Sequence, residues 1–148
     1  MNTPPDIFNW QAIVIGTVAL LLCLATEGAS VVVVMTRLKP LVRAFTLAGR
    51  TVSAHVAFFS SVLILLGSHL LQICIWAAFL YYAGTVDNPH TAALLAGSTY
   101  TTVGFANDTL TQQWQLRAVI MAVTGLFAFA WSTSILYALS QQVYRSET

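Results

Sequence analysis

Three long apolar runs divide the chain. They cover residues 11–35, about 53–84 and about 115–139, and Glu27 interrupts the first of them. A helix needs about 20 predominantly apolar residues to cross the hydrocarbon of a bilayer. The pattern therefore predicts three transmembrane helices in an all-α membrane protein. Pro40 is expected to break the chain after the first span, and residues 41–52 to form a short helix at the membrane interface.

Composition supports the membrane assignment. Hydrophobic residues make up 57% of the 148 positions and charged residues 7%, whereas a soluble domain carries about 25% charged residues. The net charge of +1 gives no basis for binding nucleic acid. The sequence contains no paired carboxylates, no nucleophile with its base and no metal-ligand spacing, so an enzyme is not expected, nor is a cofactor. The first run is too long for a signal-peptide core and is expected to be retained.

Basic residues indicate the orientation. Arg37, Lys39, Arg43 and Arg50 lie between the first two spans with no acid among them, and loops rich in Lys and Arg stay in the cytoplasm. With three spans, the N-terminus then lies outside and the C-terminus inside. We expect a multi-pass protein of the plasma or inner membrane, with the lipid bilayer as its surroundings.

The segment 85–114 is neither a clear span nor an ordinary loop. Asn88-Pro89 marks a turn, and residues 90–100 form a helical pattern much too short to cross a bilayer. An extended polar stretch follows, before the third span begins. A short helix and a non-helical strand between two full spans predict a re-entrant pore loop, because such backbone is tolerated at membrane depth only where it lines a water-filled path or is buried.

The polar stretch resembles the selectivity filter of potassium channels. Its residues are Thr101, Thr102, Val103, Gly104, Phe105, Ala106, Asn107 and Asp108, against the family pattern Thr-Val-Gly-Tyr-Gly-Asp. The resemblance covers roughly residues 53–140 and implies a homotetramer with a re-entrant pore helix and one filter strand per subunit. It also implies that K⁺ is held by Thr102 and by the backbone carbonyls of Val103, Gly104 and Phe105. A strand of inward-facing carbonyls needs glycine where φ is positive, which Gly104 provides, and Val103 and Phe105 are expected to pack behind the strand. Asp108, at the outer mouth with Asn107, would attract cations.

The filter departs from the family pattern in three places. Ala106 stands where the family has its second glycine, and a non-glycine residue at positive φ costs roughly 1 kcal/mol. Phe105 replaces the common tyrosine, and Asn107 takes the place of the usual aspartate. The filter strands of Trk-type potassium transporters also keep only one glycine, but those proteins chain four such loops in one polypeptide. These departures bear on the selectivity of the filter for potassium and leave the predicted pore unchanged.

Two further sites remain open from the sequence. Gly125, about twenty residues after the filter, is either an inner-helix hinge or a close-packing residue, and Phe129 or Leu136 is the candidate constriction. Glu27 is the one acid inside a span and is either a structural clip, hydrogen-bonded to Ser60 and Ser61, or a proton- or cation-sensing element.

These observations predict one organisation and leave alternatives for its function. Residues 1–52 form an N-terminal transmembrane helix with a basic cytoplasmic or interfacial segment, 53–140 the pore module and 141–148 a short cytoplasmic tail. The predicted function is a passive homotetrameric cation channel that conducts potassium. The alternatives are a non-conducting subunit that packs against or regulates another membrane protein, or a potassium-transporter-like pore of low throughput. Other protein subunits are unknown.

Overall fold

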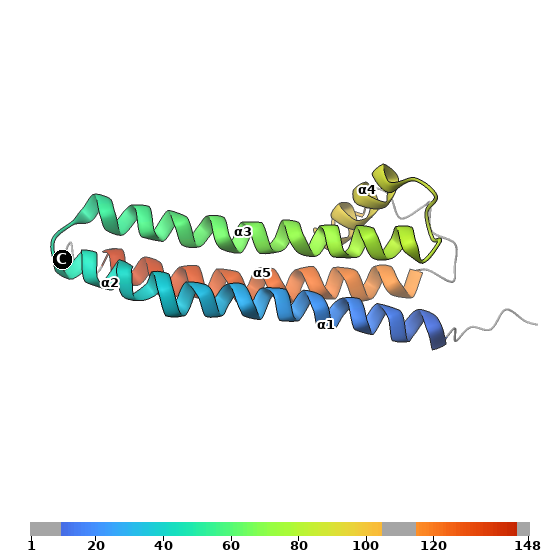
Figure 1. The fold of residues 1–148 in the computed structure, drawn as a ribbon, viewed down its shortest axis with the longest axis horizontal. Helices are drawn as coiled ribbons and strands as arrows, with labels where there is room; N and C mark the ends of the chain where they lie inside the picture. Colours follow the sequence, from blue (N-terminus) through green and yellow to red (C-terminus); the bar gives the residue numbers. More distant parts are fainter. Residues whose placement is uncertain (1–9, 105–114, 145–148) are drawn as a thin grey trace, which may run out of the picture. The chain divides into compact units, whose positions relative to one another are not determined.

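The computed structural model describes residues 10–104 and 115–144, and the elements within them are helical. In chain order these are α1 (Trp10–Val33), the π-helix η1 (Val34–Leu38), α2 (Lys39–Leu47), α3 (Thr51–Tyr82), α4 (Pro89–Tyr100) and α5 (Gln115–Tyr144) (Figure 1). The segments Gly16–Leu47, Thr51–Tyr82 and Arg117–Tyr144 are each long and apolar enough to span a membrane. The prediction of an all-helical, multi-pass membrane protein is thereby confirmed.

The chain divides into two compact units, and each long helix contributes to both. One unit contains Met1–Cys23 and Ile73–Leu126, and the other contains Leu24–Gln72 and Phe127–Thr148. We call them the α4 unit and the basic unit, after the short helix and the cluster of basic residues that they hold.

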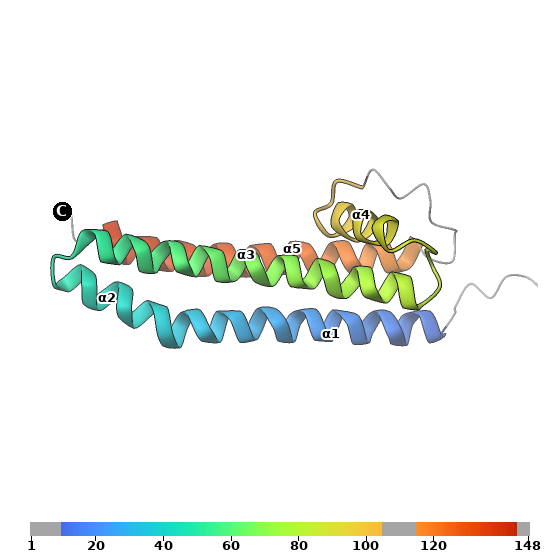
Figure 2. The same cartoon turned by 45° about the horizontal axis from the view of Figure 1, so that its top comes forward.

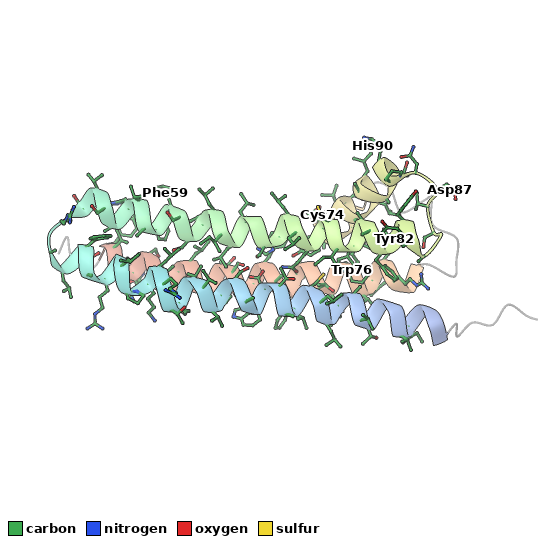
Figure 3. The ribbon with its side chains drawn as sticks, in the orientation of Figure 1. Phe59, Cys74, Trp76, Tyr82, Asp87 and His90 are labelled. Atoms are coloured by element: carbon green, nitrogen blue, oxygen red, sulfur yellow. The ribbon has the colours of Figure 1, made fainter. Side chains whose placement is uncertain are left out.

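In the α4 unit, the short helix α4 packs on α3 and α5. The predicted short helix over residues 90–100 is present, one residue longer at its start. Gly97 of α4 faces Ile73 of α3, whose Cγ2 lies 3.8 Å from the position of a Cβ on residue 97. Trp76 and Leu80 are fully buried in the same unit, and Figure 3 shows Trp76 pointing inward while Asp87 and His90 lie at the start of α4.

In the basic unit, apolar side chains from all of its helices form the core. One cluster centres on Val34, Leu65 and Leu139, and a second joins Val42 of α2 to Ala57 and Val143. Both views place α2 beside the first turns of α3 and the last turns of α5 (Figures 1 and 2). The outer sides of these helices expose large apolar side chains, such as Phe59 at 60% (Figure 3), as expected for surfaces that face lipid.

Pro40 does not break the helical path after the first apolar run, contrary to the sequence prediction. The π-helix Val34–Leu38 leads directly into α2, which carries Pro40 in its first turn. Proline is accommodated there because the π-turn before it breaks the regular i→i−4 hydrogen-bond pattern, in which the proline ring would clash with the carbonyl four residues earlier. A π-turn widens the backbone and is a known site of bending, and Figure 2 shows the chain changing direction between α1 and α2.

Glycine ends both α2 and α3. Gly49 has φ 67° and Gly84 has φ 65°, a conformation that glycine adopts without a steric penalty. After Gly49, the N–H of Arg50 donates to the carbonyl of Phe45 at 2.9 Å, which is the hydrogen bond of a Schellman C-cap. The first of these turns returns the chain from α2 to α3, and the second starts the approach to α4.

Candidate functional site: the α4 end and the buried glutamate

A capped N-terminus fixes where α4 begins. The side chain of Asn88 accepts a hydrogen bond from the backbone N–H of His90 at 2.8 Å, and Pro89 occupies the first helical turn. Asparagine before proline is a strong helix-start signal because it satisfies a backbone donor that the helix leaves free. The twelve-residue helix that follows spans well under the thickness of a bilayer.

The C-terminal half of α4 is buried in the α4 unit. Ser98, Thr99 and Tyr100 are 4%, 3% and 0% exposed. The carbonyl of Tyr100 lies against Gly125 of α5: a Cβ on residue 125 would overlap the Tyr100 carbonyl oxygen and lie 3.0 Å from its carbonyl carbon. This close approach fixes the end of α4 on α5 and gives Gly125 a packing role. Whether it is also a hinge stays a prediction.

The backbone after α4 alternates in handedness. Thr101 caps the helix with φ −84°, Thr102 has φ 62° and Gly104 has φ 73°, while Val103 between them has negative φ. The N–H of Thr102 donates to the carbonyl of Thr99, and that of Gly104 to the carbonyl of Ser98, each at 3.0 Å. Residues that alternate in this way turn successive peptide groups toward one side, so that N–H groups gather on one face of the turn and carbonyls on the other. Here the N–H groups of Thr102 and Gly104 are bonded to carbonyls of α4.

Thr102 is the strained residue of this turn. A β-branched residue at positive φ is a genuine outlier that costs on the order of 1–2 kcal/mol. Such conformations persist where surrounding structure holds them, and they cluster at functional sites. The sequence predicted positive φ at Gly104, which is confirmed, but it gave no sign that Thr102 also adopts it, since nothing in residue type favours that conformation.

The other predicted filter residues have different outcomes. Thr101, Thr102 and Val103 are exposed in the single chain, and Val103, expected to pack behind the strand, is 65% exposed. The predictions for Phe105, Ala106, Asn107 and Asp108 lie outside the described residues.

Glu27 lies at the centre of a polar cluster in the basic unit. Its side chain is 0% exposed. Oε2 accepts hydrogen bonds from Ser68 Oγ at 2.7 Å and from Gln72 Nε2 at 2.9 Å, and Oε1 accepts one from Ser132 Oγ at 2.5 Å. Donors from α3 and α5 therefore converge on one carboxyl group of α1. Buried polar groups need such partners, because an unsatisfied one is costly in an apolar interior.

The partners of Glu27 differ from those that the sequence predicted. Ser60 and Ser61 donate instead to Val56 and Ala57 of their own helix, at 2.9 and 3.0 Å. The prediction ended the first span near residue 35, whereas the helical path continues through η1 and α2 to Leu47. The turn into α3 therefore comes later in the chain than predicted, at Gly49. Because Glu27 lies further before this turn, it meets α3 further after it, at Ser68 and Gln72.

The candidate gate residues of α5 contact the chain's own helices. The ring of Phe129 stacks on that of His69 from α3, with centroids 4.3 Å apart and planes at 29°. Leu136 packs against the core cluster of the basic unit, and Ser132 is bonded to Glu27. Their role as a constriction stays a prediction, and in the single chain this stripe of α5 faces α1 and α3.

Sequence reasoning missed three features of these sites: the Tyr100–Gly125 contact, the strain at Thr102, and the donors Ser68, Gln72 and Ser132 to Glu27. The sequence did contain a signal for the donors, since all are polar side chains within apolar spans. In two antiparallel helices joined at Gly49, residues equally far from that glycine lie side by side, and this pairs residue 27 with residue 71. Comparisons with protein-family models, with curated proteins and with solved structures gave no match. The residues and the geometry of these two sites are therefore what indicates the function of the chain.

Proposed function

We propose that this chain is one subunit of a homotetrameric cation channel that passes potassium, with the strand that begins at Thr101 as its selectivity filter. The proposal treats α3 as the outer helix, α4 as the pore helix and α5 as the inner helix. The N-terminus lies outside and the C-terminus in the cytoplasm of a plasma or inner membrane, in accordance with the basic residues between the first two spans.

The observation that carries the proposal is the alternating backbone at Thr102 and Gly104. It follows a short helix that lies between two membrane-spanning segments, and it has φ values of 62° and 73° at alternate residues. A filter strand needs successive carbonyls on one side, so that they replace the water shell of the ion. The strain at Thr102 supports the same interpretation, because strained residues cluster at ligand-binding and active sites.

The end of α4 supports a cation site electrostatically. The last carbonyls of a helix carry a partial negative charge, which favours a cation nearby. In this chain the carbonyls of Ser98 and Thr99 already accept the N–H groups of Gly104 and Thr102, and the Tyr100 carbonyl lies against Gly125. The end of α4 therefore contributes the field of its dipole and not free carbonyl ligands. The helix is thus held rigidly where its C-terminal end precedes the strand.

Exposure of the strand supports an oligomer. Val103 is an apolar residue that is 65% exposed directly after a fully buried helix end. In a tetramer, neighbouring subunits would cover this side chain and bring four strands around one axis. The Glu27 cluster would join the N-terminal helix to the outer and inner helices, so that the extra span belongs to each subunit as a fixed part.

The test is potassium and sodium efflux from liposomes that contain the purified full chain, with paired glycine variants. Gly104→Ala and Gly84→Ala place the same side chain at nearly the same φ, 73° and 65°, but only the first lies in the strand. We expect wild type and Gly84→Ala to pass potassium faster than sodium. Gly104→Ala should lose at least about 90% of the potassium flux.

Other outcomes favour the alternatives. Equal loss of flux in both glycine variants would attribute the effect to strain in general and contradict the filter assignment. Absence of flux in wild type under every gradient, together with a monomer by native mass spectrometry, would favour a non-conducting subunit. Slow, saturating potassium uptake would favour a transporter-like pore.

A further inference from the structure

A groove lies between α2 and the start of α3 in the basic unit. It has a volume of about 370 Å³ and is lined mainly by apolar side chains, including Leu38, Leu41 and Phe45 from the α2 side and Val52 and Val56 from α3. This volume lies within the range of about 300–1,000 Å³ that is typical of small-molecule sites. Val52 and Val56 are 76% and 61% exposed, so the groove opens at the surface of the unit.

The groove has one polar end. The guanidinium carbon of Arg50 lies 5.4 Å from the centroid of the Phe45 ring, which places this cation at the edge of the groove. Ser53, three residues after Arg50, lines the same end. Toward the other end, the hydroxyl of Ser60 donates a hydrogen bond to the carbonyl of Val56. This hydroxyl group is therefore not available as a donor to a ligand in the groove. The groove is therefore shaped for an amphiphile with its head at the α2–α3 turn.

The charged side chains of the basic unit indicate the charge of the headgroup that would bind there. The described part of the basic unit carries the exposed or half-buried cations Arg37, Lys39, Arg43 and Arg50, and its acid, Glu27, is fully buried. The charge that this unit presents outward is therefore positive. Arg37 lies one helical turn before Leu41, on the groove side, whereas Arg43 lies two residues from both Leu41 and Phe45 and so on the opposite face of α2.

We propose that this groove binds an anionic phospholipid, whose phosphate contacts Arg50 and whose acyl chain lies along α2 and α3. The acyl chain then extends from the turn toward the membrane-spanning parts of both helices, which is the direction that a bilayer lipid takes. Cations beside a membrane helix attract anionic headgroups, and Arg forms strong paired hydrogen bonds with phosphate oxygens. The proposal stands independently of ion conduction.

The test measures lipid retention by native mass spectrometry of the full chain in mixed micelles, with dioleoyl phosphatidylglycerol and dioleoyl phosphatidylcholine as probes. We expect wild type to retain the anionic lipid about tenfold better than the zwitterionic one. Arg50→Gln should remove most of this preference, because one charge-assisted contact corresponds to about tenfold in affinity. Arg43→Gln removes the same charge from the opposite face and should change retention by less than about twofold.

A second variant tests the groove itself. Val56→Trp fills it from an exposed position, so folding should be preserved, and we expect it to weaken retention of both lipids. Equal effects of Arg43→Gln and Arg50→Gln would mean diffuse attraction without a site, and unchanged retention in Val56→Trp would mean that the acyl chain lies elsewhere. A dimer that Val56→Trp abolishes would assign the groove to a second copy of the chain. Each of these three results would overturn the proposal.

Discussion

The backbone carbonyl of Tyr100 lies so close to Gly125 that residue 125 has no space for a side chain. Tyr100 is the last residue of α4 and is fully buried. Two helices approach this closely in membranes where a small residue removes the side chain between their backbones. The position of α4, and with it the start of the following strand, therefore depends on one glycine in α5.

Gly125→Ala is expected to destabilise the protein. The added Cβ meets backbone atoms of Tyr100 that have no flexible way to move aside, and overpacking of this kind costs about 1–3 kcal/mol. Gly67→Ala is the matched control: Gly67 is also within a long helix, and a Cβ there meets nothing within 4 Å. It should be neutral or stabilising by up to about 1 kcal/mol. Thermal unfolding in detergent distinguishes the two, and equal behaviour would contradict the packing role.

Removing the Glu27 carboxyl group should loosen the contact among α1, α3 and α5. Glu27→Ala removes an acceptor that three buried side chains share, and of these Ser68 can still donate to the Leu65 carbonyl at 2.8 Å. We expect a loss of at least about 2 kcal/mol. Glu27→Gln keeps one acceptor oxygen and should lose less. Denaturant unfolding monitored by circular dichroism measures both.

Two buried serines allow the hydrogen bond to Glu27 to be tested apart from the effect of burying a serine. Ser132 donates to Glu27, whereas Ser61 donates to its own helix, and both are under 5% exposed. We expect Ser132→Ala to cost about 1–3 kcal/mol and Ser61→Ala well under 1. A double-mutant cycle between positions 27 and 132 should show a coupling of at least about 0.5 kcal/mol; additive losses would argue against the cluster.

Glycine substitutions at the neighbouring residues Thr101 and Thr102 should change the stability of the folded turn in opposite directions. Thr102→Gly relieves the strain of φ 62°, which offsets the greater freedom that glycine gives the unfolded chain. Thr101→Gly relieves nothing, since its φ is −84°, and it removes a hydroxyl that donates to the Gly97 carbonyl at 2.7 Å. We expect Thr101→Gly to unfold at a lower denaturant concentration, with a free-energy difference between the variants of about 1 kcal/mol or more. Equal midpoints would show that Thr102 is not strained.

The N-cap of α4 should set the stability of that helix. Asn88→Ala removes the acceptor for the His90 N–H and should cost about 1 kcal/mol, whereas Asn88→Asp keeps an acceptor and should cost little. Hydrogen exchange in α4 is the sensitive measurement, because local opening reports the loss directly. Faster exchange in both variants would mean that the loop, and not the cap, holds the helix start.

The sequence by itself determined which segments are helical and which of them span the membrane. Apolar runs longer than about 20 residues leave a chain no other way to satisfy its backbone in lipid, and Asn88-Pro89 marked the start of α4 through local backbone chemistry alone. Positive φ at Gly104 followed from residue type in the same way. These features depend on neighbours in the chain, so a single sequence contains them.

Only the tertiary structure decided which residues meet across helices. The partners of Glu27 depend on the register between α1 and α3, and that register was shifted by the continuation of the first span through Pro40, where a π-turn accommodates the proline. The contact between Tyr100 and Gly125, and the strain that falls on Thr102, depend on how the end of α4 seats on α5. Such pairings are set by packing between segments far apart in the sequence, where local residue preferences contain no information about distance.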